Sequence, residues 1–450
     1  MAIHQQDSFS FVATGDAIIT RRLLPYEGMA DEFDDLLALL RGAEATLTNF
    51  ETLVESKEGY PSSECGGTYL RSPSYVLNEL SGMGCNLFSA ATNHAFDYGH
   101  TGIEQTIDAF KKRELAMAGL GMNRYEARRP CYVETQSGRV GLVSTCTSIT
   151  PGSRAGEQSS ATNGRPGINP LDIETIYCLP ESRLEELRKL SDAVGFEDQK
   201  QSWLERGLYF NHDWNQDEYF HFGDMKFKTV DVEGGISYET DEQDKQEVLE
   251  WIEEASANAN WVIASVHSHQ GVDGRQNTTE TPEFLREFAR EAVDRGADVV
   301  VGTGPHVLRG IEIYDGAPIF YSLGNFIIQD ESVDRLPPEN FRRYGIEDYT
   351  KPSRAFDARN HNEDGELMSD RANPECWVTV VPECRFTENE SEITLHPVTL
   401  QREEERPQHG TPVLATGSNA RNILENIATR SEPFGTNVEL MDETATISIK

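Results

Sequence analysis

The chain has 450 residues, enough to bury a large core in one elaborate α/β domain or in two domains. Its 76 acidic residues against 40 Lys and Arg give a formal net charge of -36. Phosphate backbones would repel such a protein, which argues against a nucleic-acid binder. The acidic residues are spread along the whole chain, a distribution that is typical of a salt-adapted surface.

Cysteine usage and the N-terminal sequence bear on the compartment. The seven cysteines have no paired spacing, so we expect buried thiols in a reducing compartment and no disulfide framework. Residues 1–7 contain no basic region followed by an apolar run. No later segment reaches the ~20 apolar residues that a membrane span needs. We therefore expect a soluble, cytoplasmic protein without a membrane span.

The first 150 residues are predicted to alternate between strands and helices. A strand at residues 9–14 runs into Gly15 and Asp16. The next strand ends in Asn49 and Glu51, whose side chains point the same way because they are two positions apart. Further strands are predicted at 86–88, 115–118, 131–134 and 140–145, and helices at 31–41, 72–82 and 101–114.

A polar turn with Asn93, His94 and Asp97 follows the strand at residues 86–88. An amide oxygen, an imidazole and a carboxylate within five positions can bind a metal, place an acid beside it and orient that acid. Open α/β sheets bind ligands at such strand-to-helix turns. The alternative is an ordinary polar turn, because Asn and Asp are common turn residues.

The character of the chain changes after residue 150. Residues 151–170 are rich in Gly, Ser, Asn and Pro, and residues 181–206 are charged and helical. Residues 151–240 are therefore predicted to be an insertion over the core. Its aromatic residues either pack a small core of their own, which is the favoured interpretation, or line a substrate cleft. They are Trp203, Tyr209, Trp214, Tyr219 and Phe222.

Regular alternation resumes at residue 242. A helix to about residue 255 precedes the strand 261–266, which ends in His267 and His269. A second helix leads to the strand 297–301, which is followed by His306. The remaining predictions are a hairpin at 311–314 and 318–322, a polar, irregular segment at 330–373, and strands and a helix in 374–450 that complete the core.

Five predicted strands end in a possible metal ligand, and we expect these ends to lie at one edge of one sheet. A lone His at a strand end is more often structural, but five such ends together favour a site. Carboxylate, amide and imidazole ligands without thiolates suit Mn²⁺, Zn²⁺ or Fe in paired sites. Two ions ~3.5–4 Å apart clamp the oxygens of a displacement and supply a hydroxide near neutral pH. The candidate ligands are Asp16, Asn49, Glu51, Asn93, His267, His269 and His306.

These motifs, in this order and spacing, resemble the CapA-type proteins of poly-gamma-glutamate capsule synthesis, which are related to the calcineurin-like metallophosphoesterases. The resemblance covers about residues 8 to 328, with the insertion excepted, and more faintly the tail. It implies a metallophosphoesterase-like α-β-β-α sandwich for residues 8–330, with an inserted subdomain at 151–240. The matching motifs are Gly15-Asp16, Asn49-Phe50-Glu51, Asn93 to Gly99, His267, Gly304-Pro305-His306 and Tyr321 to Phe326.

The resemblance also implies roles for single residues. Asp16 and His306 would hold one metal, Asn93 and His267 the other, and Glu51 would bridge the two. His94 would be a catalytic acid that donates a proton to the leaving group, with Asp97 holding its ring. The chain has no His in residues 302–305, where the family commonly has one, and it carries His269 after His267 where many members have Trp-Gly. His269 is our candidate for the missing ligand.

The leading functional prediction is a metal-dependent hydrolase with two divalent ions that acts on an anionic substrate, either a polyglutamate amide or a phosphoester. The alternatives are a non-catalytic capsule-assembly protein, which would work with other capsule synthesis proteins, and a polymer-binding module. An anionic substrate needs a locally positive cleft in so acidic a protein. The candidate residues for it are Arg154, Arg165, Arg275 and Arg309.

Overall fold

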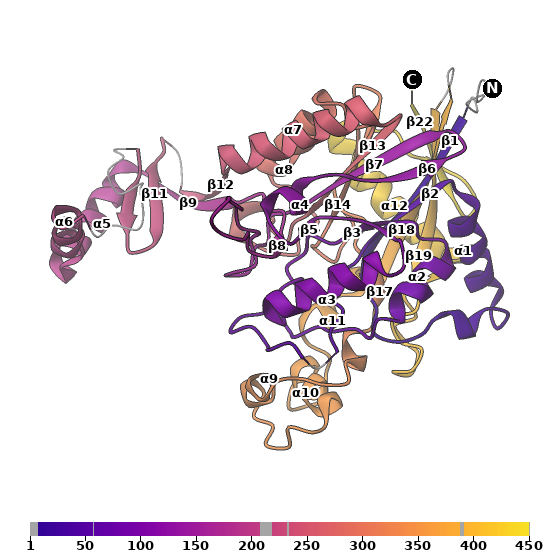
Figure 1. Cartoon of the computed structure of the whole chain (residues 1–450), viewed down its shortest axis with the longest axis horizontal. Coiled ribbons are helices and arrows are strands. Elements are labelled where there is room, and N and C mark those ends of the chain that lie inside the picture. Colours follow the sequence, from indigo (N-terminus) through magenta and orange to yellow (C-terminus); the bar gives the residue numbers. More distant parts are fainter. Residues whose placement is uncertain (1–7, 57, 208–217, 232–233, 388–390, 450) are drawn as a thin grey trace.

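The computed structural model describes residues 8–56, 58–207, 218–231, 234–387 and 391–449, and within them the chain is a mixed α/β protein with several sheets (Figure 1). None of the helices in these ranges is long and apolar enough to cross a membrane. Two large sheets, each with helices against it, make up most of the body.

The larger sheet has ten strands and is built around β1. This strand runs parallel to β2 and β17 and antiparallel to β18, so the chain after residue 374 extends the same sheet. The order β21-β22-β19-β18-β1-β2-β3-β4 is joined by β17 beside β1 and β20 beside β19. The strands are β1 (Ser8–Ile18), β2 (Ala45–Asn49), β3 (Leu87–Ser89), β4 (Ala116–Ala118), β17 (Asn325–Ile328), β18 (Val378–Thr387), β19 (Ser391–Thr399), β20 (Val413–Leu414), β21 (Glu439–Leu440) and β22 (Ala445–Ile449).

The second sheet has six strands in the order β15-β16-β14-β13-β7-β6. Its central strands β7, β13 and β14 are parallel, and the predicted hairpins supply its two edges. The strands are β6 (Cys131–Thr135), β7 (Gly138–Cys146), β13 (Trp261–His267), β14 (Val299–Thr303), β15 (Ile311–Tyr314) and β16 (Ala317–Phe320). A separate pair joins β5 (Leu120–Gly121) to β8 (Gly167–Ile168).

The two large sheets share one hydrophobic core. Successive side chains of a strand point to opposite faces, so Phe11 and Ala13 of β1 enter the core that also holds Ile263 and Val299 of the second sheet. Val12, between them, faces a different core with the helices. Both faces of these strands are therefore buried, which explains why they are almost continuously apolar.

Helices cover the outer faces of both sheets. The core outside the larger sheet contains side chains of α1 and α2, and the core outside the second sheet contains side chains of α7 and α8. Helix α12 packs into the core between the sheets. The helices outside the arm described next are α1 (Asp31–Gly42), α2 (Val76–Met83), α3 (Gly99–Lys111), α4 (Arg124–Arg128), α7 (Glu242–Asn258), α8 (Glu283–Asp294), α9 (Pro338–Arg343), α10 (Pro352–Asn360), α11 (Ser369–Ala372) and α12 (Gly417–Ser431).

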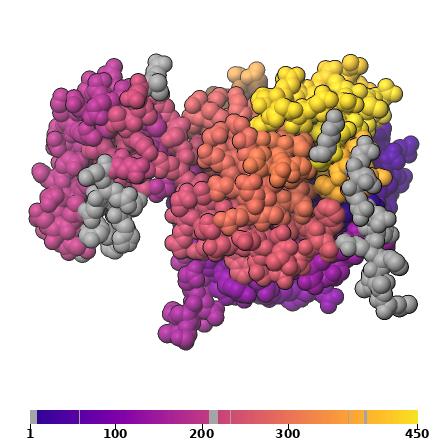
Figure 2. All heavy atoms as spheres, turned by 90° about the horizontal axis from the view of Figure 1, so that it is seen from above, coloured from indigo at the N-terminus to yellow at the C-terminus, as the bar shows by residue number. Residues whose placement is uncertain are grey.

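We call residues 173–240 the arm, and they include a small sheet of their own. Its order is β10-β11-β9-β12, and it stands to one side of the two large sheets (Figures 1 and 2). The treatment of residues 151–240 as an insertion and of residues 374–450 as completing the core stays a prediction about domain boundaries. The arm's elements are β9 (Ile173–Leu179), α5 (Glu181–Val194), α6 (Phe196–Glu205), β10 (Phe220–Phe222), β11 (Met225–Thr229) and β12 (Gly235–Thr240).

Two secondary-structure predictions were wrong. The helix predicted from residue 72 begins at Val76, because Ser72 is bridged to Val54 and its N–H donates to the Leu53 carbonyl. Residues 330–373, predicted to be irregular, contain the short helices α9, α10 and α11. The sequence signal for two of them was a proline at the first helical position, Pro338 and Pro352.

Candidate metal centre

The candidate ligands come together where strands of the two large sheets end. Asp16, Asn49 and Glu51 lie on or just after β1 and β2, while His267 and Thr303 are the last residues of β13 and β14. The prediction of one edge of one sheet was wrong, since β1 and β2 belong to the larger sheet and β13 and β14 to the second. Parallel strands within each sheet bring their carboxyl ends to one side, and the shared core places the two sides together.

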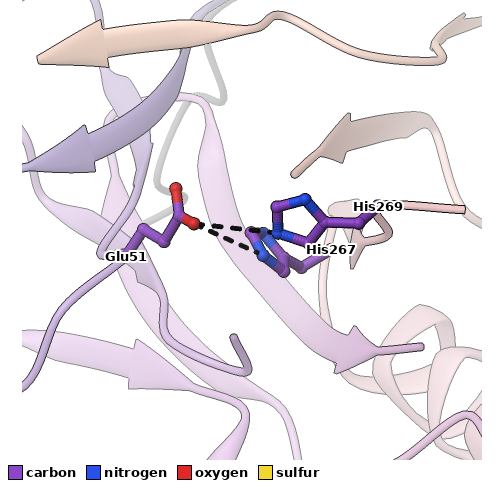
Figure 3. Close-up of side chains that lie close together, drawn as sticks. All are labelled: Glu51, His267 and His269. Carbon is purple, nitrogen blue, oxygen red and sulfur yellow. Dashed lines mark ion pairs between the residues drawn. The ribbon is translucent and has the colours of Figure 1, made fainter. Parts of the chain in front are cut away.

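Glu51 lies at the middle of this cluster. It is completely buried, and neither carboxylate oxygen has a hydrogen-bond partner within the described residues. Its Oε1 lies 3.8 Å from His267 Nε2 and 3.9 Å from His269 Nε2, as Figure 3 shows. Its Oε2 lies 4.0 Å from His306 Nδ1. The carboxylate therefore faces three imidazoles at distances too long for direct hydrogen bonds.

Two groups of ligand atoms share Glu51. Asp16, Glu51 and His306 form one group, and Glu51, His267 and His269 form the other. Within each group the ligand atoms lie within 4.8 Å of one another. Asp16 also links the groups, because its two oxygens lie 3.6 Å from His267 Nδ1 and 3.6 Å from His306 Nδ1.

Burial and the neighbouring groups shift the pKa values of the two buried carboxyls, Glu51 and Asp16, in opposite directions. Burial raises the pKa of Glu51 well above its ordinary value, and the negative charge of Asp16 adds to the rise. Burial would also raise the pKa of Asp16, but the nearby imidazoles of His267 and His306, each 3.6 Å away, outweigh burial and hold that pKa below its usual range. The two carboxyls therefore differ, with Asp16 the stronger acid.

The pKa values of the three imidazoles are also shifted in different directions. Burial lowers the pKa of His267 and lowers the pKa of His269 strongly, so both rings are neutral at neutral pH, the form that binds metal. Burial lowers the pKa of His306 too, but the electrostatic interactions of its ring with Glu51 and Asp16 outweigh burial and raise the pKa to about 9. At neutral pH the positive charge at the cluster thus resides on His306.

Strained and crowded backbone positions Asp16 and His306. A Cβ on Gly15 would lie 2.0 Å from the carbonyl oxygen of Gly324, so only glycine lets β1 approach this segment. The Asp16 N–H then donates to that same carbonyl, at 2.8 Å. His306 has a φ of 60°, in the left-handed region that a non-glycine residue adopts only when its surroundings enforce it. Such strain is concentrated at functional sites.

Three supporting side chains were not predicted as site residues. Asn325 Oδ1 lies 2.9 Å from His306 Nδ1, and Asn277 Oδ1 lies 2.8 Å from His269 Nδ1. The contact with Asn277 leaves His269 Nε2 directed at Glu51, without a hydrogen-bond partner in the described chain. Ser148 Oγ accepts the His269 N–H. Asn325 lies in a motif that the sequence singled out, whereas Asn277 and Ser148 carried no recognisable signal.

The two candidate amide ligands are placed differently. Asn93 Oδ1 lies 2.9 Å from His267 Nε2, next to the second group of ligand atoms. Asn49 donates its Nδ2–H to Asp16 Oδ1 at 2.8 Å and lies 3.2 Å from His267 Nδ1, while its own Oδ1 is buried without a partner. Asn49 therefore bridges Asp16 and His267, and its role as a ligand stays a prediction.

His94 and Asp97 form a buried pair beside the ligands. His94 Nδ1 lies 2.7 Å from Asp97 Oδ2. Asp97 also accepts backbone N–H groups from Gly66, at 3.0 Å, and Leu70, at 2.7 Å, which fix its carboxylate. The ring is thus held by Nδ1, and its Nε2 is the nitrogen left for proton transfer.

Thr303 occupies the segment where the resembling family commonly has a histidine. Its Oγ1 lies 3.0 Å from His267 Nδ1. The hydroxyl therefore orients a candidate ligand, while the second imidazole of that group comes from His269, two residues after the end of β13. The arrangement is consistent with His269 substituting for the missing ligand.

A cavity of about 530 Å³ opens over the cluster. His94, Asn93, His269 and His306 line its floor, and residues of the 330–373 segment, including Arg359 and Arg371, line a wall. The four arginines proposed for a positive cleft are not part of this lining within the described residues. Arg154 forms an ion pair with Asp172. Arg165 and Arg275 each donate a hydrogen bond to a backbone carbonyl. Arg309 is buried and donates to the carbonyls of Gln270 and Thr278.

The aromatic residues of the arm also lie away from the cavity. Trp203, Tyr219 and Phe222 are absent from its lining, while Tyr209 and Trp214 fall outside the described residues. Phe222 instead contacts Phe196 with ring centroids 4.9 Å apart, and Tyr219 bonds to Glu239. These contacts favour packing within the arm over a role in substrate binding.

The residues present fit divalent cations. Four buried polar atoms at the cluster have no hydrogen-bond partner within the described residues: both oxygens of Glu51, Asn49 Oδ1 and His269 Nε2. Buried polar groups are rarely left unpaired, and a bound cation satisfies lone pairs of this kind. The donor set of carboxylate oxygens and imidazole nitrogens without thiolates suits Mn²⁺, Zn²⁺ or Fe.

The fold and the site define a mixed α/β protein with a buried carboxylate and histidine cluster under an open cavity. Residues 10–330 match the family described as bacterial capsule synthesis protein PGA_cap. Because this match covers most of the chain, the protein belongs to that family, and the resemblance seen in the motifs is confirmed.

Relatives agree with the family assignment. Uncharacterized protein y4sH of Sinorhizobium fredii (strain NBRC 101917 / NGR234) is 33% identical over 456 residues, which cover 98% of this chain and 94% of the relative. PGA biosynthesis protein CapA of Bacillus subtilis (strain 168) is 23% identical over 72% of this chain and 64% of its own length. Capsule biosynthesis protein CapA of Bacillus anthracis is 22% identical over 76% of this chain and 65% of its own length.

Proposed function

We propose that the protein is a metal-dependent hydrolase of the CapA type, linked to the synthesis or processing of a poly-gamma-glutamate capsule. Its two large sheets and their covering helices would form a metallophosphoesterase-like α-β-β-α sandwich. The observation that carries the proposal is Glu51, a buried carboxylate that has no hydrogen-bond partner among the described residues and belongs to two groups of ligand atoms. The names of the Bacillus relatives support the link to capsule biosynthesis.

Each group of ligand atoms would hold one divalent ion. Asp16, Glu51 and His306 would hold the first, and Glu51, His267, His269 and Asn93 the second. When bound, a pair of such ions polarises the oxygens of a scissile group and lowers the pKa of water. Glu51 is the residue that both groups share, so its two oxygens would fix how the two ions lie relative to each other.

The other residues of the site would orient the substrate and supply a proton. His94 lines the cavity floor and is tied to Asp97 through Nδ1. Its Nε2 would donate a proton to the departing oxygen or nitrogen, and Asp97 would stabilise the protonated ring before the transfer. Burial of the Asp97 carboxylate under two backbone N–H groups keeps the imidazole in one orientation.

A non-catalytic role in capsule assembly is the second candidate, and Thr303 is the observation that favours it. A histidine in that segment would add a ligand, whereas the Thr303 hydroxyl only contacts His267. With fewer imidazoles the cluster would hold metal for structure without activating water. The two candidates differ in turnover, and in the assembly role the metals would be structural or absent.

Metal analysis combined with an activity panel tests the proposal. We expect about two equivalents of metal per chain, and hydrolysis of either a gamma-glutamyl polymer or a phosphoester that requires Mn²⁺ and stops with a chelator. His267→Ala should release metal and abolish hydrolysis together. Bound metal without hydrolysis of any substrate would favour the assembly role. A wild-type protein that binds no metal would contradict the hydrolase.

A further inference from the structure

Two arginines of the 330–373 segment stand on the wall of the cavity beside the candidate metal centre. Arg359 lies in the last turn of α10 and Arg371 lies in α11, and both line the cavity with His94 and His306. They are far in sequence from the five predicted strand ends. Neither belongs to the ligand cluster, and the proposed hydrolysis assigns them no task.

The fold ties this wall to the ligands. Asn325, which lies 2.9 Å from His306 Nδ1, donates its Nδ2–H to the carbonyl of Cys376 at 2.9 Å. The next residue, Trp377, donates its indole N–H to the carbonyl of Arg371 at 3.1 Å. The Arg371 guanidinium lies 5.0 Å from the centre of the Trp377 ring. Arg371 is therefore held in one position relative to His306.

The two guanidinium groups share one carboxylate. Asp330 accepts an ion pair from Arg371 and another from Arg359, whose Nη1 lies 3.2 Å from Asp330 Oδ2. The neighbouring Glu331 lies 3.9 Å from Arg371 Nε, but it is engaged by Arg406 at 3.3 Å and by His409 at 3.5 Å. One carboxylate between two arginines leaves a positive charge at the wall.

Arg371 also keeps a free donor. Its side chain is almost completely buried, and its Nη1 has no hydrogen-bond partner within the described residues. Burial lowers the pKa of Arg371 to about 10, so the group stays charged at neutral pH. An unpaired N–H on a buried cation is costly, and an oxyanion is the partner that a guanidinium takes most readily.

Two of the three acidic residues of the cavity lining are paired with arginines. Asp172 is paired with Arg154, and Asp330 is the carboxylate that the two arginines share. Asp370 accepts a hydrogen bond from Asn277 Nδ2 at 3.3 Å and keeps its charge, but it is exposed, so solvent screens it. In a chain with a net charge of -36, this wall therefore offers an anion two arginines whose lining carboxylates are either shared or screened.

We propose that Arg359 and Arg371 form a subsite for an oxyanion of the substrate, a carboxylate or a phosphate, while the bond to be cut lies over the metal centre. The inference rests on the proposed function and deepens it, since it says where the charge of the substrate binds. A gamma-linked glutamyl chain carries such a carboxylate on every residue beside the amide, and a phosphodiester or phosphomonoester offers the alternative oxyanion.

The test is the binding of defined probes to the full-length protein by titration calorimetry. The probes are a short gamma-glutamyl oligomer, its uncharged methyl ester and inorganic phosphate, each titrated with Mn²⁺ and with a chelator, because oxyanions also bind metals. Arg359→Gln and Arg371→Lys are compared with Arg354→Gln. Arg354 is on the same helix, α10, is 59% exposed and is outside the cavity lining in the described chain.

Arg359→Gln should weaken binding of the charged oligomer or of phosphate by about 10- to 100-fold, the range expected for a charge-assisted hydrogen bond. Arg371→Lys keeps the charge but loses the planar fork, so it should weaken binding less, by about 3- to 10-fold. Arg354→Gln and the methyl ester should show no difference. An effect on the oligomer alone identifies a carboxylate subsite, and an effect on phosphate alone identifies a phosphate subsite.

The inference is overturned if both variants bind the two charged probes as tightly as the wild type does. It is also overturned if the wild-type protein binds neither probe. If Arg371→Lys does not fold, Arg359→Gln alone decides, because Arg359 is partly exposed. Metal content is measured on the same samples. If the variants lose probe binding but the protein contains no metal, the subsite stands and the hydrolase is rejected. If the protein contains metal but the variants bind the probes as the wild type does, the hydrolase stands and the subsite is rejected.

Discussion

The candidate metal centre and the arm satisfy their charged groups in opposite ways. At the centre, Glu51 is completely buried and its oxygens have no hydrogen-bond partner among the described residues. In the arm, Lys228 is 40% exposed and pairs with Glu218 at 3.1 Å and Glu239 at 3.4 Å, within reach of water. Both regions contain many charged residues. Lys228 of the arm is paired and hydrated, whereas Glu51 is shielded from water and has no hydrogen-bond partner among the described residues.

The difference shows how a functional cluster is distinguished from a charged surface. Exposed ion pairs contribute little, because water and salt compete for both partners. A buried carboxylate without partners destabilises the fold unless something else binds it. Grouping such a carboxylate with neutral imidazoles is therefore evidence for a cation-binding site, which a count of charges in the sequence cannot provide.

The largest expected effect is on turnover at His94. Replacing His94 with Asn should lower the turnover number by about 10²–10⁴-fold, the range for the loss of a general acid. Metal content should not change, because His94 faces Asp97 and is outside both groups of ligand atoms. Steady-state kinetics and elemental analysis of the same preparation check this. A variant that loses metal would assign His94 to the ligands instead.

Glu51→Gln sharpens the comparison through stability. In the wild-type protein, each Mn²⁺ site at 100 times its dissociation constant should raise the free energy of unfolding by about 2.7 kcal/mol. In the variant most of that gain should disappear, because an amide nitrogen faces one of the two ions. Without metal the variant should be as stable as wild type or about 1 kcal/mol more stable, because a partnerless carboxyl is removed. A metal-free variant that is strongly destabilised would show that Glu51 is a structural group.

His269→Ala should have an intermediate effect. The substitution removes one imidazole from the group that contains His267, so occupancy should fall from about two ions toward one. Excess Mn²⁺ should restore part of the activity, because Glu51, His267 and Asn93 remain. The measurement is metal per chain against the concentration of free Mn²⁺. Asn277→Ala, which removes only the partner of His269 Nδ1, should produce a smaller change in the same direction.

Salt should act on the surface and not on the buried cluster. With a net charge of -36, self-repulsion is screened as ionic strength increases, so the melting temperature should rise from low to molar KCl. Glu51→Gln should show the same slope, because Glu51 is completely buried. A melting temperature that is independent of salt would contradict the expectation of a salt-adapted surface.

The smallest effect is expected in the arm. Lys228→Ala removes two exposed ion pairs, and such pairs contribute less than about 1 kcal/mol. Metal content and turnover should equal those of the wild type, and the unfolding free energy from denaturant titration should change by less than that amount. Any loss of metal in this variant would mean that the arm and the centre are coupled.

The sequence by itself determined the chemistry and the local structure of the core. Runs such as residues 261–266 are almost wholly apolar because both faces of their strands are buried, and this made the strands, and the polar groups that follow them, readable in order. The proximity of His94 and Asp97 could also be predicted from the sequence, because two residues that are three positions apart in one turn must lie close together. Family membership followed from the same motifs.

Only the tertiary structure decided how these pieces meet. Strand pairing is non-local, so the sequence did not show that β1 and β13 belong to different sheets whose shared core brings Asp16 to His267. Nor did it indicate Asn277 beside His269, or Arg359 and Arg371 on the cavity wall, because the hydrophobic pattern of a loop or a short helix does not show which distant segment it packs against. The arginines near the motifs in sequence bond elsewhere, since distance along the chain does not fix distance in space.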